Sequence, residues 1–104
     1  MHDILSEKLP EAMEGTLLLD FYSPTCTPCK ALLPVLTNLR ETFAGRVSFA
    51  KFNVESDDYK TASSFQVRSV PTLILFHQGK ILGRRSGTAT PTELQNWIEE
   101  LLPS

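Results

Sequence analysis

Alternating stretches of apolar and polar residues divide the chain into strands and helices. Three apolar runs are short and bounded by residues that favour turns, which is typical of strands in a covered sheet. Residues 77–80 then predict a hairpin turn, because Gly79 lies between the third of these runs and one further stretch of strand-like composition. The last two strands should therefore pair in antiparallel fashion. The four expected strands are residues 16–22, 47–54, 72–76 and 81–86.

Apolar residues at helical spacing predict helices between these strands. A short helix is expected around residues 4–13, limited by Pro10, and a longer one over residues 26–44. Pro34 should kink the longer helix because it lacks an amide donor, and Gly45 should end it. Another short helix should run to Phe65, with its N-terminus capped by Asp57 or Asp58.

The last helix has the clearest boundaries. Residues 90–93 read Thr-Pro-Thr-Glu, a capping box with proline at the first helical position. The apolar stripe that follows is expected to face the core, not a ligand. The stripe consists of Leu94, Trp97, Ile98 and Leu101.

The order of the predicted elements indicates the fold class. A strand–helix–strand unit followed by a hairpin and a helix predicts an α/β fold, a mixed sheet covered by helices on both faces.

Composition narrows the class of protein. With 104 residues, 41% hydrophobic and 21% charged, residues 1–104 should form one domain around one core. The net charge of −2 argues against a nucleic-acid partner, and no apolar run approaches membrane-spanning length. The N-terminus lacks the basic start and apolar segment of an export signal, so we expect a cytoplasmic protein. In that compartment an isolated cysteine pair is more often catalytic than structural.

The cysteine pair Cys26-Thr27-Pro28-Cys29 follows the first predicted strand and opens the long helix. Residues three apart in a first helical turn lie side by side, with about 5–6 Å between their Cβ atoms, so a disulfide can form after a small adjustment. Cys26, nearer the helix start, meets unpaired N–H groups and the positive end of the helix dipole, which favour the thiolate. This placement predicts thiol–disulfide exchange.

Two other interpretations of the pair carry less weight. Half of a zinc site needs further ligands, but the chain has no other cysteine, and its histidines, His2 and His77, are isolated. A purely structural disulfide that closes so short a loop would constrain the unfolded chain little. We therefore expect no metal site.

Three residues outside the pair could also carry chemistry. Asp20 interrupts an apolar strand, so it should be buried with a raised pKa, as a proton acceptor or as a carboxylate that only orients the backbone. Lys51 has no obvious partner and reads as a lysine with a buried stem and an exposed head. Pro71 begins a strand, and general frequencies favour its trans isomer, since only about 5–6% of such bonds are cis.

Read together, these motifs resemble the thioredoxin family. The resemblance runs in unbroken order from about Thr16 to the C-terminus, and several separated motifs in register are more specific than any one of them. The residues that carry the resemblance are 19–22, 26–30, Pro34, 51–54 and 70–73, together with Phe76, Gly79 and Gly87.

The resemblance implies a role for each site residue. Cys26 would be the attacking nucleophile and Cys29 the resolving thiol, while Asp20 would accept the proton of Cys29 and Lys51 would tune that carboxylate. Pro71 would be a cis proline that faces the disulfide and shapes a groove where a substrate segment pairs through its main chain. The residues expected to contact substrate are Thr25, Thr27, Pro28, Val70, Pro71 and Gly87.

Three departures from the family pattern stand out. Thr25 occupies the position where members usually carry tryptophan, and Thr27 the position where they usually carry glycine. The first change affects partner specificity and the second affects the reduction potential. The chain also leaves little room for the family's first edge strand, so we expect a thioredoxin fold with four strands in place of five.

The resemblance implies a protein-disulfide reductase that needs no cofactor beyond its own Cys26–Cys29 disulfide. Its partners would be disulfide-containing proteins and a thioredoxin-reductase-type enzyme, and the chain would act as a monomer. Within the fold, the alternatives are an oxidase or isomerase, or a dedicated redox carrier for one partner enzyme. The alternative from another class is a binding module that uses the same surface without catalysis.

Overall fold

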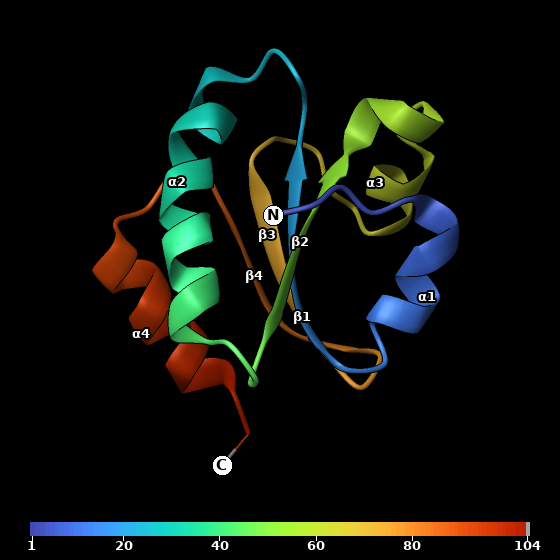
Figure 1. Ribbon diagram of the computed structural model, residues 1–104. Coiled ribbons are helices and arrows are strands. Elements are labelled where there is room, and N and C mark those ends of the chain that lie inside the picture. The colour runs from blue at the N-terminus through green and yellow to red at the C-terminus, as the bar shows by residue number, and fades with distance from the viewer. Residues whose placement is uncertain (104) are drawn as a thin grey trace.

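A computed structural model describes residues 1–103 and arranges them as a sheet between two layers of helices (Figure 1). No helix among these residues is long and apolar enough to cross a membrane. The elements in chain order are the 3-10 helix η1 (Ser6–Lys8), α1 (Leu9–Ala12), β1 (Thr16–Tyr22), α2 (Thr27–Thr42), β2 (Ser48–Asn53), η2 (Val54–Asp57, also 3-10), α3 (Lys60–Ser64), β3 (Thr72–His77), β4 (Lys80–Ser86) and α4 (Pro91–Leu101).

The sheet is mixed and has four strands in the order β2-β1-β3-β4, which confirms the predicted fold class. β1 pairs with β2 in parallel, and the other two pairs are antiparallel. The predicted bounds hold for β1, differ by one residue at both ends of β2, and differ by one residue at one end of β3 and of β4. The hairpin turn is the pair Gln78–Gly79, with φ of 52° and 80°. Positive φ at both positions is what a two-residue type I′ turn requires.

At the outer edge of β2, where the family resemblance left little room for a further strand, the N-terminal segment makes a single bridge. Lys51 on the outer strand β2 accepts a hydrogen bond from the amide of Ile4 (2.9 Å) and donates its own amide to the carbonyl of His2 (3.1 Å). These two bonds make the isolated parallel bridge between Asp3 and Lys51. The expectation of four strands is therefore confirmed, and the N-terminal segment still lies along the edge of β2.

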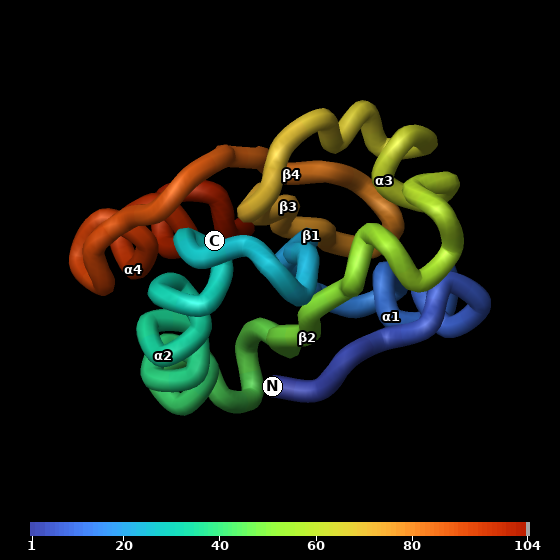
Figure 2. Tube along the Cα trace, turned by 90° about the horizontal axis from the view of Figure 1, so that it is seen from above, coloured from blue at the N-terminus to red at the C-terminus, as the bar shows by residue number. Residues whose placement is uncertain are grey.

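Alternation along the strands sends side chains to two separate cores. The even-numbered Leu18 of β1 lies with the leucines of α2 and α4, whereas Leu17, Leu19 and Phe21 lie with residues of α1 and the α3 region. Figures 1 and 2 show the corresponding layers, with α2 and α4 on one face of the sheet and α1 and α3 on the other. Asp20 shares the period of Leu18, so its side chain belongs to the face covered by α2.

Two helix predictions need correction. The N-terminal segment is not one helix but a 3-10 turn followed by a short α-helix, and Pro10 lies in the first turn of α1, where no amide donor is needed. α3 begins after Tyr59, not after Asp57 or Asp58, and Tyr59 provides no side-chain cap. Asp57 does the capping from further back, because its carboxylate accepts the amide of Thr61 at 3.1 Å.

α2 follows the prediction more closely. It runs without interruption through Pro34 from Thr27 to Thr42, and Gly45 follows it with φ of 82°. The positive φ explains why glycine suits this position. Cys26, expected as the first helical residue, is the N-cap. The kink expected at Pro34 stays a prediction.

The capping box of α4 provides a test of local stability. The hydroxyl of Thr90 accepts the amide of Glu93 at 3.1 Å, and the Glu93 carboxylate accepts the amide of Thr90 at 3.0 Å. Thr90→Ala removes the first of these bonds and should lower the free energy of unfolding by about 1 kcal/mol, measured by urea denaturation. Thr88→Ala, at an exposed position just outside the box, is the matched control. Equal losses in the two variants would contradict the capping role.

β4 forms the second edge of the sheet and differs in character from the other strands. Its pairing with β3 shifts register at Leu75 and Phe76, the mark of a β-bulge. The guanidinium of Arg84 donates to the carbonyls of Phe65 (2.6 Å) and Gln66 (3.0 Å), which ties the strand to the end of α3. The edge therefore carries basic side chains and an irregular backbone.

Candidate active site

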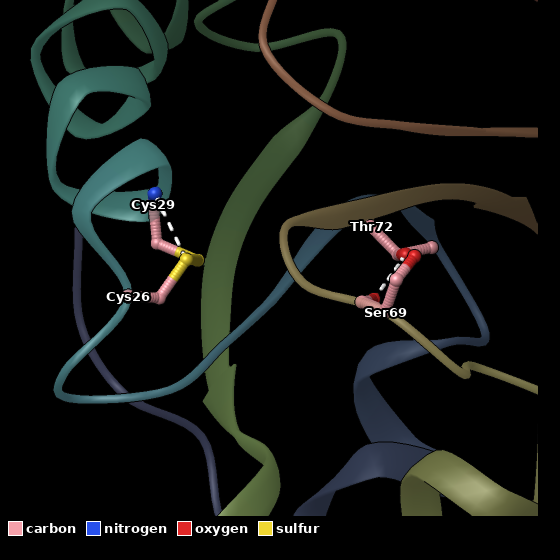
Figure 3. The surroundings of a disulfide bond; sticks show 4 residues. All are labelled: Cys26, Cys29, Ser69 and Thr72. Atoms are coloured by element: carbon pink, nitrogen blue, oxygen red, sulfur yellow. Dashed lines mark hydrogen bonds between the residues drawn. A yellow bond between two sulfur atoms is a disulfide. The ribbon is translucent and has the colours of Figure 1, made fainter.

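Cys26 and Cys29 are joined as a disulfide at the start of α2, with 5.2 Å between their Cα atoms. The two sulfurs are not equivalent. Cys26 is the N-cap, partly exposed, and its sulfur accepts the amide of Cys29 at 3.1 Å (Figure 3). Cys29 is buried, with only 4% of its surface exposed. The reachable sulfur is thus also the one that meets a backbone donor and the positive end of a helix.

The local sequence explains this placement. β1 ends at Tyr22, and a turn closes where the amide of Cys26 donates to the carbonyl of Ser23 at 3.2 Å. Pro28 lies at the second helical position, where its missing amide leaves no bond unmade. Thr25, Thr27 and Pro28, predicted to contact substrate, are all exposed on either side of Cys26.

Asp20 lies on β1 with 2% of its surface exposed, and its Oδ1 has no hydrogen-bond partner among residues 1–103. Burial raises the pKa of this carboxyl from its ordinary value of 3.8 to about 7, while the positive charge of Lys51 acts in the opposite direction. Asp20 therefore exchanges its proton near neutral pH. That is the property needed of a proton acceptor in catalysis.

A cavity of about 110 Å³ connects Asp20 with Cys29 and Lys51. Its volume is sufficient for water molecules, and its wall provides polar partners for them. The cavity therefore provides a path along which water can carry a proton between the buried thiol and the carboxylate. The full lining consists of Asp20, Tyr22, Ser23, Pro24, Cys29, Lys30, Leu33 and Lys51.

Lys51 is the partner of Asp20 in the register of β1 and β2. The sequence suggested no partner for this lysine, and this was wrong. Its side chain is 21% exposed, its ammonium lies 4.9 Å from the centre of the Tyr22 ring, and it lies 3.8 Å from a carboxylate oxygen of Asp3. The ammonium is therefore held by the Tyr22 ring and the Asp3 carboxylate, and its charge also acts on Asp20.

The Val70–Pro71 peptide bond is cis, as the family resemblance implied and against the general frequency of such bonds. Pro71 directly precedes β3, whose first residue Thr72 pairs with Phe21 near the end of β1. The proline and the cysteines thus lie at the same end of the sheet. Figure 3 shows the bond from the Thr72 hydroxyl to the Ser69 carbonyl (2.7 Å) in the surroundings of the disulfide.

Gly87 and Val70 complete this loop. The amide of Gly87 donates to the carbonyl of Pro71 at 3.0 Å, so the end of β4 fixes the proline from the other side. The backbone N–H and C=O of Val70 make no hydrogen bond within residues 1–103. An extended segment of another chain can therefore pair with them.

Two residues of this site, Asp3 and Tyr22, were not predicted from the sequence. The hydroxyl of Tyr22 donates to the carboxylate of Asp3, which also pairs with Lys51. A hydroxyl at the end of an apolar strand was the only signal for Tyr22. Nothing local indicated Asp3, because its contact depends on how the N-terminal segment lies along β2.

Comparisons with known proteins agree with this geometry. The model of the family described as Thioredoxin matches residues 5–100. The chain is 43% identical to a thioredoxin of Haemophilus influenzae over 84 residues, which cover 81% of this chain and 78% of that protein. It is 34% identical to a thioredoxin of Buchnera aphidicola, with 80% and 76% covered. A thioredoxin of Synechocystis is 32% identical, with 96% and 87% covered.

Proposed function

The chain belongs to the thioredoxin family and is a thiol–disulfide oxidoreductase with disulfide reductase activity, and from this premise we propose which atoms carry each step. The observation that carries the proposal is the inequality of the two sulfurs, one partly exposed at the helix N-cap and one buried beside Asp20.

In the first step the Cys26 thiolate attacks one sulfur of a substrate disulfide. A bond forms between Cys26 and that sulfur, the substrate S–S bond breaks, and the other substrate sulfur leaves as a thiolate that takes a proton from solvent. The amide of Cys29 and the helix dipole stabilise the attacking charge. Exposure of Cys26 lets the substrate approach in line.

In the second step Cys29 gives its proton to Asp20 and attacks the Cys26 sulfur. The mixed disulfide breaks, the second substrate sulfur leaves as a thiolate, and the Cys26–Cys29 disulfide forms. Two electrons have then passed from the dithiol to the substrate. Lys51 tunes the acceptor, because its positive charge favours the ionised form of Asp20.

Substrate segments dock beside the disulfide by main-chain pairing with Val70, next to Pro71 and Gly87. The unpaired backbone groups of Val70 support this assignment, since added strands bind through such groups. Thr25, Thr27 and Pro28 form the opposite side of the contact. Because Thr25 has no aromatic ring, the contact at that side is small and polar.

The oxidised protein needs a dithiol donor of the thioredoxin-reductase type to return to the reduced state. We further propose that the chain works as a monomer in the cytoplasm. In a reducing compartment the pair would be kept available for catalysis and not locked as a structural bridge, which fits the role proposed for Cys26 and Cys29.

The direct test is reduction of insulin disulfides with dithiothreitol as the electron source. The wild-type chain should accelerate the reaction, and the same chain alkylated at its cysteines, the control, should not. A non-enzymatic binding module would leave the rate unchanged in both cases.

The reduction potential of the Cys26–Cys29 pair tests the direction of electron flow. We expect a value near the roughly −270 mV known for thioredoxin, measured by equilibration with glutathione. A value near about −120 mV, typical of a strong periplasmic oxidant, would instead make the protein an oxidase.

A further inference from the structure

The carboxylate of Asp3 makes two polar contacts above the edge strand β2. It accepts the hydroxyl of Tyr22, and its Oδ2 lies 3.8 Å from the ammonium of Lys51. Both partners also line the cavity that holds Asp20. The N-terminal segment thus reaches the side chains around the proton acceptor although it is remote from the cysteines in sequence.

The position of Asp3 does not depend on its charge. The backbone on both sides of it bonds to Lys51, through the carbonyl of His2 and the amide of Ile4, at 3.1 and 2.9 Å. The side chain is therefore held over Lys51 by the bridge itself. Because the backbone bridge and not the charge holds this segment, the charge of Asp3 can be removed while the segment stays in place.

Lys51 lies between two carboxyl groups that compete for one ammonium. Asp20 is its neighbour across the sheet, and Asp3 is its partner on the outer side of β2. An ammonium held toward Asp3 acts on Asp20 from a greater distance, and the negative charge of Asp3 opposes its field there, while Asp20 Oδ1 has no hydrogen-bond partner among residues 1–103. Contact with the outer carboxylate therefore weakens the effect of Lys51 on the inner one.

We propose that Asp3 is a positioning residue that holds the Lys51 ammonium toward the outer edge of β2 and thereby keeps Asp20 a stronger proton acceptor. The proposal deepens the proposed function and rests on its assignment of Asp20. It assigns to the N-terminal segment a part in setting the pH at which the buried carboxyl exchanges its proton.

The other groups around Asp20 do not replace the contact between Asp3 and Lys51. Lys30 is exposed on α2 and lines the same cavity, whereas Leu73, the neighbour of Asp20 on β3, carries no charge. The polar and titratable groups that line this cavity, or act on it through one of these, are Cys29 and Lys30 from α2, Lys51 from β2, Tyr22 from β1, Ser23 directly after it and Asp3 from the N-terminal segment.

The test is the titration of Asp20 in the oxidised protein, followed by NMR of its ¹³C-labelled carboxyl carbon and assigned with Asp20→Asn. In Asp3→Asn the amide oxygen can still accept the Tyr22 hydroxyl, but the ammonium is released toward Asp20. The midpoint should fall by about half a pH unit or more, because an opposite charge nearby favours the ionised form. Glu7→Gln, another carboxylate neutralised in the exposed N-terminal segment, should leave the midpoint unchanged.

A second pair of variants tests the route through Lys51. In the Lys51→Met background only the direct field of Asp3 remains, so Asp3→Asn should move the midpoint less than it does with Lys51 present. Equal changes in the two backgrounds, or no change in the first, would overturn the proposal. Thermal melting of each variant verifies that the fold is intact, and a purely structural role of Asp3 would alter melting without moving the midpoint.

The titration separates this proposal from the one on which it rests. If Asp20→Asn leaves the resolving step at its normal rate, the proton-acceptor role fails, yet the carboxyl midpoint still reports whether Asp3 acts through Lys51. If the role holds, the rate of resolution in Asp3→Asn should reach half its maximum at a lower pH, by the same amount as the NMR midpoint.

Discussion

Cys29→Ser should accumulate a covalent adduct with a disulfide substrate, while Cys26→Ser should form none and lose reductase activity. The reason is geometric, since the Cys26 sulfur is partly exposed and bonded to a backbone amide, whereas Cys29 is 4% exposed. Without Cys29 nothing resolves the mixed disulfide. Without Cys26 the buried thiol has no path to the substrate.

Intact-mass spectrometry after incubation of each reduced variant with insulin, under conditions that preserve disulfides, measures this difference. Wild-type protein should show oxidised chain and little adduct, because Cys29 resolves it. The double variant, with both cysteines replaced by serine, is the control for non-covalent association. Equal yields of adduct from the two single variants would contradict the assigned roles.

Asp20→Asn should stabilise the oxidised protein at high pH and have no such effect near pH 4. The folded-state pKa of Asp20 is about 7 against an ordinary value of 3.8. Below the lower value the carboxyl is protonated in both states and no stability is lost. As pH rises toward 7 the unfolded chain releases the proton while the folded chain retains it, so the free energy of unfolding falls.

Above about pH 7 the loss in the free energy of unfolding becomes constant. Its upper value is about 4 kcal/mol, which corresponds to the difference between the two pKa values. Denaturation of the wild type and the variant across pH 4–9 measures it. The control Asp58→Asn removes an exposed carboxylate at a residue with positive φ, where asparagine fits, and should leave the pH dependence as in the wild type. A stability difference that does not change with pH would show that ionisation of Asp20 is not the cause.

Replacement of Asp20 should also change the rates of the two half-reactions. Asp20→Asn should slow the resolving step more than the first attack, because only the buried thiol passes its proton to this carboxyl. Stopped-flow measurement of each half-reaction separates the two rates. Unchanged rates in both would remove Asp20 from the mechanism.

Much of this architecture follows from local rules. The capping box beginning at Thr90 and the turn at Gln78–Gly79 depend on neighbouring residues only, so both were predictable. Burial of Asp20 was equally predictable, because apolar residues occupy both faces of β1 around it.

The remaining features depend on contacts between distant segments. General frequencies favoured trans at Pro71, and only the resemblance to a family indicated cis. Lys51 was predicted to have no partner because Asp3 and Tyr22 reach it only once the N-terminal segment lies along β2.

The bulged, basic edge at β4 has a consequence for behaviour in concentrated solution. Exposed edges are templates for uncontrolled association of one molecule with the next, and bulges and positive side chains are common protections against it. Here the register shift and the guanidinium of Arg84 protect one edge, and the short bridge from Asp3 occupies part of the other. The protein can thus offer open backbone groups to its substrates at Val70 while its sheet margins resist aggregation.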